Sequence, residues 1–519
     1  MPPIPGKPGS LTLLNAPPEG ARKGRNRVAR APPPRGKPVA GTGFHDFTSG
    51  LEPTHVSRAE LTISRMRSVR PAKAAAGGAP APHVPPAGAA FTMAAPMPTA
   101  EQASSTSLDL SWVRSQFPSL AQTVNGHPAV FLDGPGGTQV PQRVIDAISD
   151  YLAINNANTG GAYQTSRNTD RMIAEARAAM ADFLNCDADE IVIGPNMTTL
   201  TYAMSRAIGR ELVPGDEIVL TLLDHDANFS PWNALEEKGV IIRTVAFNPV
   251  DCTLDMQDLV RQITSRTRLI AVGYASNAVG TINNVAEGVR LAKQVGALSY
   301  IDAVHYAPHG PIDVRALDCD FLVCSTYKFF GPHMGLLYGK REHLKRFRPY
   351  KVRPLTDSIP NCWEWGTLNH ECIAGIKACV DYWEELGRRA KPSVSSRRAA
   401  VLAAHEAIHP HERTMMEKMI AGLLAIPGLK VYGISDPRRF DNRCATIVVR
   451  VEGFTPLELA TKLGDRGFFT WDGNYYALNV TEQLDVERTG GFLRIGLVHY
   501  NTMEEVERML AALREVVRA

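Results

Sequence analysis

Short, uninterrupted runs of valine, isoleucine and leucine recur along the first three fifths of the chain, starting near Leu108. Such runs are typical of strands that are buried on both faces of a parallel sheet, because polar alternation is needed only where one face meets water. The predicted strands are AVFL (129–132), EIVIG (190–194), DEIVLTLL (216–223), IIRTVAF (241–247), RLIAVGYAS (268–276), LSYID (298–302) and FLVCS (321–325).

Helical patterns separate these predicted strands. Pro141 suits the first turn of a helix over 141–153, and Gly209 suits the end of a helix that starts near Thr199. Further helices are expected around NALEEKG (233–239), at 255–265 and over VAEGVRLAKQVG (285–296). This alternation predicts an α/β fold, with a large, mostly parallel sheet and helices on both faces.

The pattern changes after about residue 375. Two long helical stretches, 373–388 and 398–425, precede the strand-like segments LKVYG, ATIVVRVE and FLRIGLVHY and a last helix, MEEVERMLAALREVV. This succession predicts a smaller α+β domain at the C-terminus. We therefore expect a large domain over 106–378 and a small domain over 379–519.

Composition separates residues 1–100 from the rest of the chain. This segment holds 18 of the 37 prolines, with 13 Lys and Arg against 4 Asp and Glu, while the remainder carries 43 basic and 49 acidic residues. The overall charge of +3 therefore gives no indication of nucleic-acid binding. We expect residues 1–105 to be a disordered basic extension, a transit peptide being the alternative, and synthesis starting at Met93 would leave out residues 1–92.

The sequence has no apolar run of the ~20 residues that a membrane-spanning helix needs, and no signal-peptide pattern. Its eight cysteines form neither a CxxC motif nor the framework of a small disulfide-rich domain. We expect free thiols in a cytoplasmic protein that binds neither membranes nor nucleic acid.

Polar side chains gather where the predicted strands end, which is where open α/β sheets bind ligands. MTTL (197–200) offers hydroxyl and N–H groups that suit a phosphate. The other strand ends carry His225, Asn277, the pair Asp302 and His305, and the set Ser325, Tyr327 and Lys328.

Lys328 lies between a buried strand and two phenylalanines, where an ammonium group is costly unless it is paired or neutralised. A phosphate site, a strand-end aspartate and a lysine 26 residues later are the parts that hold pyridoxal 5'-phosphate. The lysine would be neutralised by forming a Schiff base with the aldehyde of the cofactor, and Asp302 would keep the pyridine nitrogen protonated.

The ordered series FLDGPGG, DHDANFSPW, SNAVGTINNVAE, IDAVHYAPHGPIDVRALDCDF, STYKFFGPHMGLLYG, WEWGTLN and LRIGLVHYNT resembles the class V aminotransferase-fold enzymes. It is most similar to their cysteine desulfurase and selenocysteine lyase branch, over roughly 108–519. The resemblance implies the pyridoxal phosphate-dependent transferase fold (fold type I). It also implies a homodimer with shared active sites that acts on a small amino acid.

The resemblance also implies a role for each matching residue. Lys328 would be the Schiff-base lysine and the proton shuttle, and His225 would stack on the cofactor ring. Arg494 would grip the substrate α-carboxylate. The other expected cofactor contacts are Met197, Thr198, Thr199, Ser325 and Tyr327 at the phosphate, Thr367 from the partner subunit, Asp302 at the ring nitrogen, and Asn277 and His305 near the ring hydroxyl, with Asn277 also near the substrate.

The chain departs from this family at three places. Tyr327 stands where histidine is usual, and His305 where glutamine is usual. The loop that carries the persulfide-forming cysteine of desulfurases reads FFTWDGNYYALNVTEQLD (468–485) and contains no cysteine, with Tyr475 or Tyr476 in its place. Cys362 and Cys372 flank the Thr367 block and are the substitute thiols to consider.

The resulting hypothesis is a cysteine desulfurase-like enzyme that performs C–S lyase or related elimination chemistry. An aminotransferase or an amino-acid racemase or epimerase is the alternative from the same fold, and a catalytically silent binding protein is the alternative of another class. HEAIH (405–409) matches a zinc-protease signature, but no further ligand motif follows it, and GPGG (134–137) fits a tight turn. We therefore expect no metal ligands.

Overall fold

The computed structural model describes residues 108–518. The predicted extension at 1–105, the possible start at Met93 and the transit-peptide alternative lie outside these residues. Within them no helix is long and apolar enough to cross a membrane, and all eight cysteines of the chain are unpaired.

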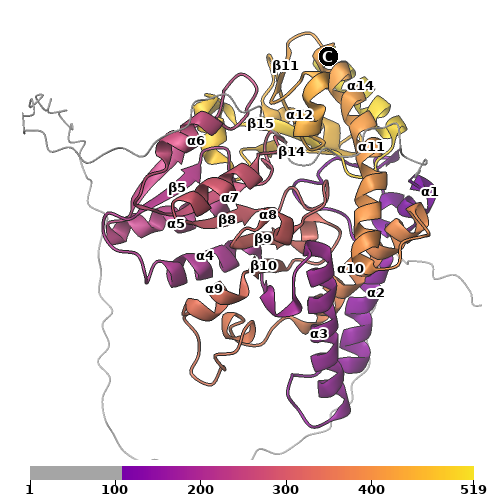
Figure 1. The fold of residues 1–519 in the computed structure, drawn as a ribbon. Helices are drawn as coiled ribbons and strands as arrows, with labels where there is room; N and C mark the ends of the chain where they lie inside the picture. The colour runs from indigo at the N-terminus through magenta and orange to yellow at the C-terminus, as the bar shows by residue number, and fades with distance from the viewer. Residues whose placement is uncertain (1–107, 519) are drawn as a thin grey trace, which may run out of the picture. The chain divides into compact units, whose positions relative to one another are not determined.

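A seven-stranded sheet forms the centre of the fold (Figure 1). All neighbouring strands are parallel except at β10, which is antiparallel to both of its neighbours. The α/β fold with a large, mostly parallel sheet is therefore confirmed. In sheet order the strands are β4 (Ile191–Gly194), β10 (Gly335–Gly339), β9 (Phe321–Ser325), β8 (Leu298–Asp302), β7 (Thr267–Gly273), β5 (Glu217–Thr221) and β6 (Ile241–Val245).

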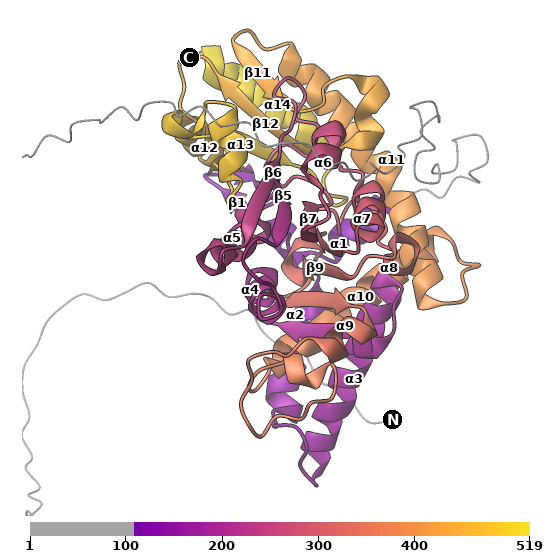
Figure 2. The ribbon, with the colours of Figure 1, turned by 60° about the vertical axis from the view of Figure 1, so that its left-hand side comes forward.

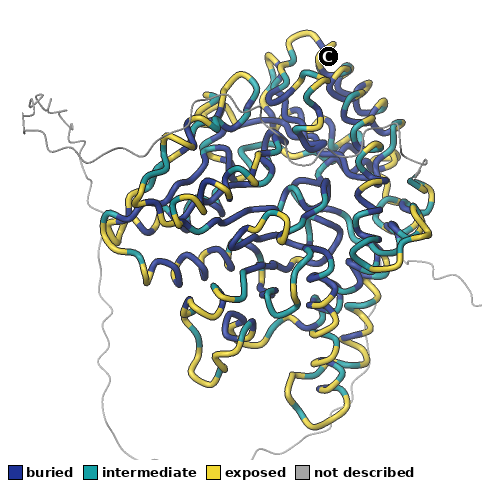
Figure 3. The backbone as a smooth tube through the Cα atoms, viewed as in Figure 1, coloured by how far each residue is buried: buried dark blue, intermediate teal, exposed yellow. Residues whose placement is uncertain are grey.

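Both faces of this sheet are covered, as the continuous apolar runs predict (Figure 3). Ile218 and Leu220 of β5 pack in one core cluster with α4 (Met197–Ile208), whereas Val219 between them packs in another cluster with α7 (Val285–Gln294). The remaining short helices of this part are α5 (Ser230–Asn233), α6 (Met256–Gln262), α8 (Val314–Leu317) and α9 (Arg341–Arg346).

Four further helices stand on the side of the sheet where α7 packs: α2 (Gln142–Asp150), α3 (Gln164–Leu184), α10 (His370–Ala390) and α11 (Arg397–Leu424). Of these, α10 contacts each of the other three. The segment between α2 and α3 is largely exposed (Figure 3). The predicted domain boundary between residues 378 and 379 lies inside α10, and the division into two domains stays a prediction.

The C-terminal part is built on a four-stranded antiparallel sheet (Figure 2). In sheet order its strands are β11 (Leu429–Tyr432), β12 (Thr446–Val451), β15 (Phe492–Gly496) and β14 (Trp471–Gly473). A second apolar core joins this sheet to the end of α11 and to two further helices, α12 (Pro456–Gly464) and α14 (Met503–Arg518).

The first buried strand of the sequence does not enter the large sheet. β3 (Val130–Phe131) pairs in parallel with β13 (Phe468–Phe469), so the start of the described chain lies against its C-terminal part. This pairing places the turn that follows β3 beside β15, where Asp133 forms a bridge to Gly496. The other short elements are α1 (Leu110–Ser115), β1 (Thr123–Val124), β2 (His127–Pro128) and α13 (Leu478–Gln483).

Candidate active site

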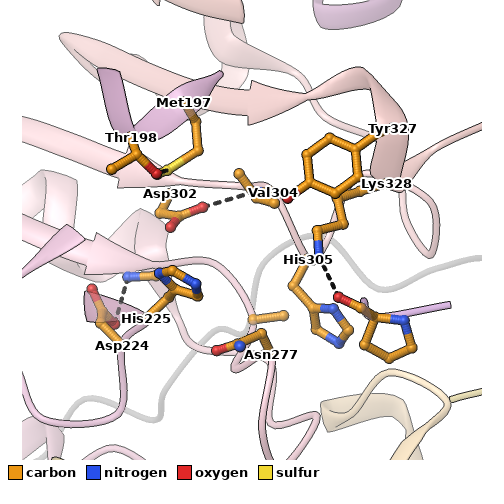
Figure 4. A pocket seen from close by; sticks show the side chains of 13 residues that line it. Met197, Thr198, Asp224, His225, Asn277, Asp302, Val304, His305, Tyr327 and Lys328 are labelled. Atoms are coloured by element: carbon orange, nitrogen blue, oxygen red, sulfur yellow. Dashed lines mark hydrogen bonds between the residues drawn. The ribbon is translucent and has the colours of Figure 1, made fainter. Parts of the chain in front are cut away.

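A cavity opens at the carboxyl ends of five strands of the large sheet (Figure 4). Eight of the residues predicted from the sequence line it: Met197, Thr198, His225, Asn277, Asp302, His305, Tyr327 and Lys328. The sequence analysis missed five more: Pro135, Asp224, Gly273, Ala275 and Val304. Parallel strands bring these residues together because their carboxyl ends meet at one edge of the sheet.

Lys328 points its amine into this cavity from the turn that follows β9. Its Nζ donates hydrogen bonds to the carbonyl oxygens of Pro135 and Gly136, the latter at 3.1 Å. Burial lowers the pKa of Lys328 to about 7, with Arg494 acting in the same direction and Asp302 opposing it. Near neutral pH the Lys328 amine is therefore unprotonated, and hence nucleophilic, in a large fraction of the molecules.

Asp302 ends β8 inside the cavity. Its Oδ1 accepts a hydrogen bond from the backbone N–H of Val304 at 2.9 Å, and burial raises the pKa of its carboxyl group to about 6. The positive charge of Lys328 acts against this rise in pKa, because an opposite charge favours the ionised carboxylate. A protonated ring nitrogen would be a second cationic partner for this carboxylate.

Asp224 is a second buried carboxylate that the sequence analysis did not single out. It accepts hydrogen bonds from Thr221 Oγ1 at 2.5 Å, Asn228 Nδ2 at 2.7 Å and the backbone N–H of Gly273 at 2.9 Å. Burial raises its pKa to about 7, and the neighbouring Asp302 adds to the shift. Since its partners come from two segments, Asp224 fixes the end of β5 against the end of β7.

His225 follows Asp224 and lines the cavity as a neutral imidazole. Its Nδ1 accepts a hydrogen bond from the backbone N–H of Ala227 at 2.9 Å, which leaves the proton on Nε2. Burial lowers its pKa to about 4. The ring of Tyr476 stacks on that of His225 with a centroid distance of 5.5 Å.

The N-terminus of α4 closes the opposite end of the cavity. Asn196 caps this helix by accepting the N–H of Thr199 at 2.8 Å, and the N–H of Met197 donates to Ser325 Oγ at 3.2 Å. A helix N-terminus with hydroxyl groups beside it suits a phosphate. Gly335 permits this arrangement, since a Cβ there would lie 2.2 Å from the backbone of Asn196.

Arg494 approaches the cavity from β15 of the small sheet and contacts Asn277, which belongs to the lining. Its Nη1 donates to the carbonyl of Asn277 at 2.9 Å, and its guanidinium lies 4.0 Å from the centre of the Tyr475 ring. Its Nε is buried and has no hydrogen-bond partner. Burial lowers its pKa to about 10, so the group stays cationic at neutral pH. A buried cation with an unused donor is suited to receive a carboxylate.

The loop between β14 and α13 closes over this arginine. Asn277 Nδ2 donates to the carbonyl of Tyr475 at 2.8 Å, and the N–H of Asp226 donates to the carbonyl of Tyr476 at 2.7 Å. The hydroxyl of Tyr475 donates to the carbonyls of Trp471 and Phe492. The hydroxyl of this tyrosine is therefore held by the backbone of β14 and β15, and it does not face the cavity as a nucleophile.

Four predicted contacts, Arg494 among them, lie outside the cavity lining. Ser325 lies beneath the α4 N-terminus, while Thr199 and Thr367 are exposed. The loop that bears Thr367 is anchored by buried Glu364, which accepts Arg177 Nη1 at 2.6 Å and the N–H of Ile193 at 2.8 Å. The contribution of Thr367 to a partner subunit stays a prediction.

The HEAIH motif lies in α11, away from the cavity. His405 is buried against the ring of Trp383, with a centroid distance of 4.6 Å, and Glu406 forms an ion pair with Lys391 at 3.6 Å. Within residues 108–518 these side chains form no group of three candidate metal ligands. The motif is thus part of the helical packing.

The donor set fits pyridoxal phosphate. The helix N-terminus offers an anion site, Lys328 offers an amine, and Asp302 offers a carboxylate 26 residues before it. Asn277 Oδ1 is buried without a hydrogen-bond partner, as expected of a polar group whose partner is a ligand.

Comparison with known proteins gives a consistent result. The family model described as aminotransferase class-V matches residues 130–509. The aminotransferase-like protein FGM3 of Gibberella zeae is 31% identical over 80% of this chain and 100% of its own length. A probable cysteine desulfurase of Synechocystis is 31% identical over 78% of this chain and 95% of its own length.

A solved structure shares the fold. The apo cysteine desulfurase of Thermococcus onnurineus superposes with a TM-score of 0.68 at 25% identity, covering 78% of this chain and 98% of that chain. The likeness spans both the large parallel sheet and the C-terminal part, which agrees with the fold type I architecture expected from the sequence.

Proposed function

This chain belongs to the aminotransferase class-V family of pyridoxal phosphate enzymes, with cysteine desulfurases among its relatives, and we propose that it acts on the α-amino group of a small amino acid. In this proposal Lys328 binds the cofactor covalently. The reaction is C–S lyase or related elimination chemistry without a protein-bound persulfide.

The observation that carries the proposal is the amine of Lys328 in a cavity that also holds Asp302 and His225. Its pKa of about 7 lies near the operating pH, which suits a group that must both take up and release a proton. When bound, pyridoxal phosphate supplies an electron sink for the bond that breaks at the substrate α-carbon. Lys328 would remove the proton from that carbon.

The other side chains bind and orient. The α4 N-terminus and Ser325 would hold the phosphate, and Asp302 would hold the protonated ring nitrogen. Asn277 lines the cavity and Arg494 binds its carbonyl from outside the lining, so these two residues would receive the α-carboxylate. The closed loop at Tyr475 and Tyr476 limits the space beyond that point, which favours a small amino acid.

Replacing Arg494 with lysine should weaken amino-acid binding more than cofactor binding. Lysine keeps the charge but loses the two-pronged hydrogen bonding of a guanidinium, so we expect the apparent Kd to rise roughly 10–100-fold. The measurement is a titration with a panel of amino acids that follows the cofactor absorbance. Arg450→Lys, on the neighbouring strand β12, is the matched control. An equal loss of cofactor and amino-acid affinity would make Arg494 a structural residue.

The side chains of the loop at 468–485 decide whether the protein can accept sulfur from the substrate. A desulfurase needs a thiolate that accepts sulfur, whereas residues 468–485 offer tyrosines, and the Tyr475 hydroxyl is bound to backbone carbonyls. Of the two substitute thiols, Cys362 is buried and burial raises the pKa of both Cys362 and Cys372. Both shifts disfavour the reactive thiolate form.

We therefore expect no stoichiometric persulfide after incubation of the holoenzyme with L-cysteine. Intact-protein mass spectrometry under non-reducing conditions measures this directly, alongside assays for sulfide, pyruvate and alanine. Cys362→Ser and Cys372→Ser should behave as the wild type. A stoichiometric adduct of one sulfur atom that one of these changes abolishes would show that a persulfide-forming desulfurase operates here.

The same panel separates the alternatives. Release of pyruvate supports elimination, and accumulation of an amino-carrying cofactor with a keto acid indicates an aminotransferase, in line with the name of the Gibberella relative. Inversion of the α-carbon indicates a racemase. A holoenzyme that binds amino acids without any turnover would overturn the proposal in favour of a binding protein.

A further inference from the structure

Three potential metal ligands meet beside the cavity in a buried cluster that we call the His–Cys cluster: His305, His309 and Cys444. One ligand atom of each lies within 4.8 Å of the others, and the three residues are only 4%, 8% and 3% exposed. Clustered imidazole and thiol groups are the ligands that zinc prefers. Burial of all three separates this cluster from the chance groupings of a protein surface.

The cluster contains polar atoms that lack a partner. Nε2 of His305 is buried and makes no hydrogen bond. Oε1 of Glu412, which contacts the cluster through its other oxygen, is likewise buried and unpaired. A buried polar group without a partner costs free energy, so two of them at one place indicate a missing ligand.

Glu412 also prepares His309 for metal binding. Its Oε2 lies 2.7 Å from Nδ1 of His309, and both side chains are about 95% buried. A carboxylate that accepts the Nδ1–H of a histidine fixes the tautomer and leaves the Nε2 lone pair free. This carboxylate–histidine pair is the arrangement that accompanies metal-bound histidines in general.

We propose that the His–Cys cluster binds Zn²⁺ through His305, His309 and the thiolate of Cys444, with Glu412 as the carboxylate that orients His309. On binding, the Cys444 thiol loses its proton to solvent and a Zn–S bond forms. The thiolate and the Glu412 carboxylate together balance the two charges of the ion. A water molecule can fill the fourth position.

The cluster needs only a small contraction to reach zinc geometry. Zn–N and Zn–S bonds of about 2.0–2.3 Å place tetrahedral ligand atoms about 3.5 Å apart. The ligand atoms now lie within 4.8 Å of one another, so each has to move by about 1 Å or less toward a common centre to reach these bond lengths. The site would therefore form without rebuilding the backbone.

The position of the cluster suggests what the ion does. His305 and His309 lie in the segment directly after Asp302, Cys444 precedes β12, and Glu412 belongs to α11. The ion would tie the cofactor end of β8 to the small sheet. It would also hold the imidazole of His305, which lines the cavity, in one orientation. The assignment does not depend on the proposed amino-acid chemistry.

The test uses the full-length holoenzyme after treatment with a chelator and dialysis. Zn²⁺ should bind with a stoichiometry of one per chain, measured by calorimetry and by elemental analysis. Cys444→Ser should lower the affinity at least 100-fold, and Glu412→Gln should lower it roughly 10–100-fold. Cys379→Ser, a buried thiol outside the cluster, is the matched control and should bind as the wild type does.

Co²⁺ provides a second measurement on the unaltered protein. A cobalt ion bound by Cys444 should give an intense thiolate-to-metal absorption band that excess Zn²⁺ removes. Wild-type protein that is folded but binds neither ion would overturn the proposal and leave His309 and Glu412 as a simple ion pair. Zinc binding that Cys444→Ser does not weaken, with no thiolate band, would equally overturn it. Because cofactor absorbance is recorded in parallel, failure here is distinct from failure of the proposed function.

Discussion

Replacing Lys328 with alanine should abolish turnover while leaving the protein folded. The change removes the amine that lies in the cavity, and with it both the covalent attachment of the cofactor and the base at the substrate α-carbon. We expect the yellow absorbance of the holoenzyme to disappear and the turnover rate to fall by at least roughly 10²–10⁴-fold, the contribution of one positioned acid–base group.

Absorbance spectroscopy, circular dichroism and a turnover assay on the same sample check this result. Lys351→Ala is the matched control, because Lys351 is also partly buried but bonds to the carbonyl of Leu355, outside the cavity lining. A Lys328→Ala protein that keeps the absorbance of the wild type would refute the assignment of Lys328.

Replacing Asp302 with alanine should weaken cofactor binding by roughly 10²–10⁴-fold. A buried ion pair that loses one partner leaves the other charge uncompensated, at a cost of about 3–5 kcal/mol. Equilibrium dialysis with pyridoxal phosphate measures the affinity directly, without turnover. The alanine also leaves the buried N–H of Val304 without its acceptor, so a lower Tm is expected as well.

Asp302→Asn separates the charge from the hydrogen bond. Asparagine can still accept the N–H of Val304 through its side-chain oxygen, but it carries no charge for a ring nitrogen. We expect near-normal stability together with strongly reduced turnover. Wild-type turnover in this variant would show that the carboxylate charge plays no part in the chemistry.

The large sheet and most of the cavity could be predicted from the sequence because both follow local patterns. Continuous apolar runs define strands that are buried on both faces, and the residue after each run lies at a strand end. Lys328, Asp302 and His225 were found in this way. Asp224 carried the same signal, since it directly precedes His225 at a strand end. The prediction nevertheless treated it only as part of the motif DHDANFSPW.

The remaining features depend on long-range contacts that no local pattern encodes. The pairing of β3 with β13 and the hydrogen bond from Asn277 to Tyr475 join segments that are far apart in the sequence. Thr199 is exposed, and its N–H is bound by Asn196, the residue that caps α4. The direction of a side chain on a helix is not encoded by its residue type alone. The His–Cys cluster likewise depends on the fold, because it brings Cys444 next to two histidines from another segment.

The pairing of β3 with β13 has a consequence for folding during synthesis on the ribosome. Phe131 accepts a hydrogen bond from Asn501, a residue 370 positions later, so the first buried strand stays without its partners until residues 468–501 have been synthesised. Contacts of such long sequence separation form slowly and leave apolar segments open meanwhile. Arg494 is synthesised equally late. The nascent chain can therefore complete the cofactor strands early, whereas its substrate end becomes complete only after residue 494 has left the ribosome, which makes this edge the place where chaperones would be needed.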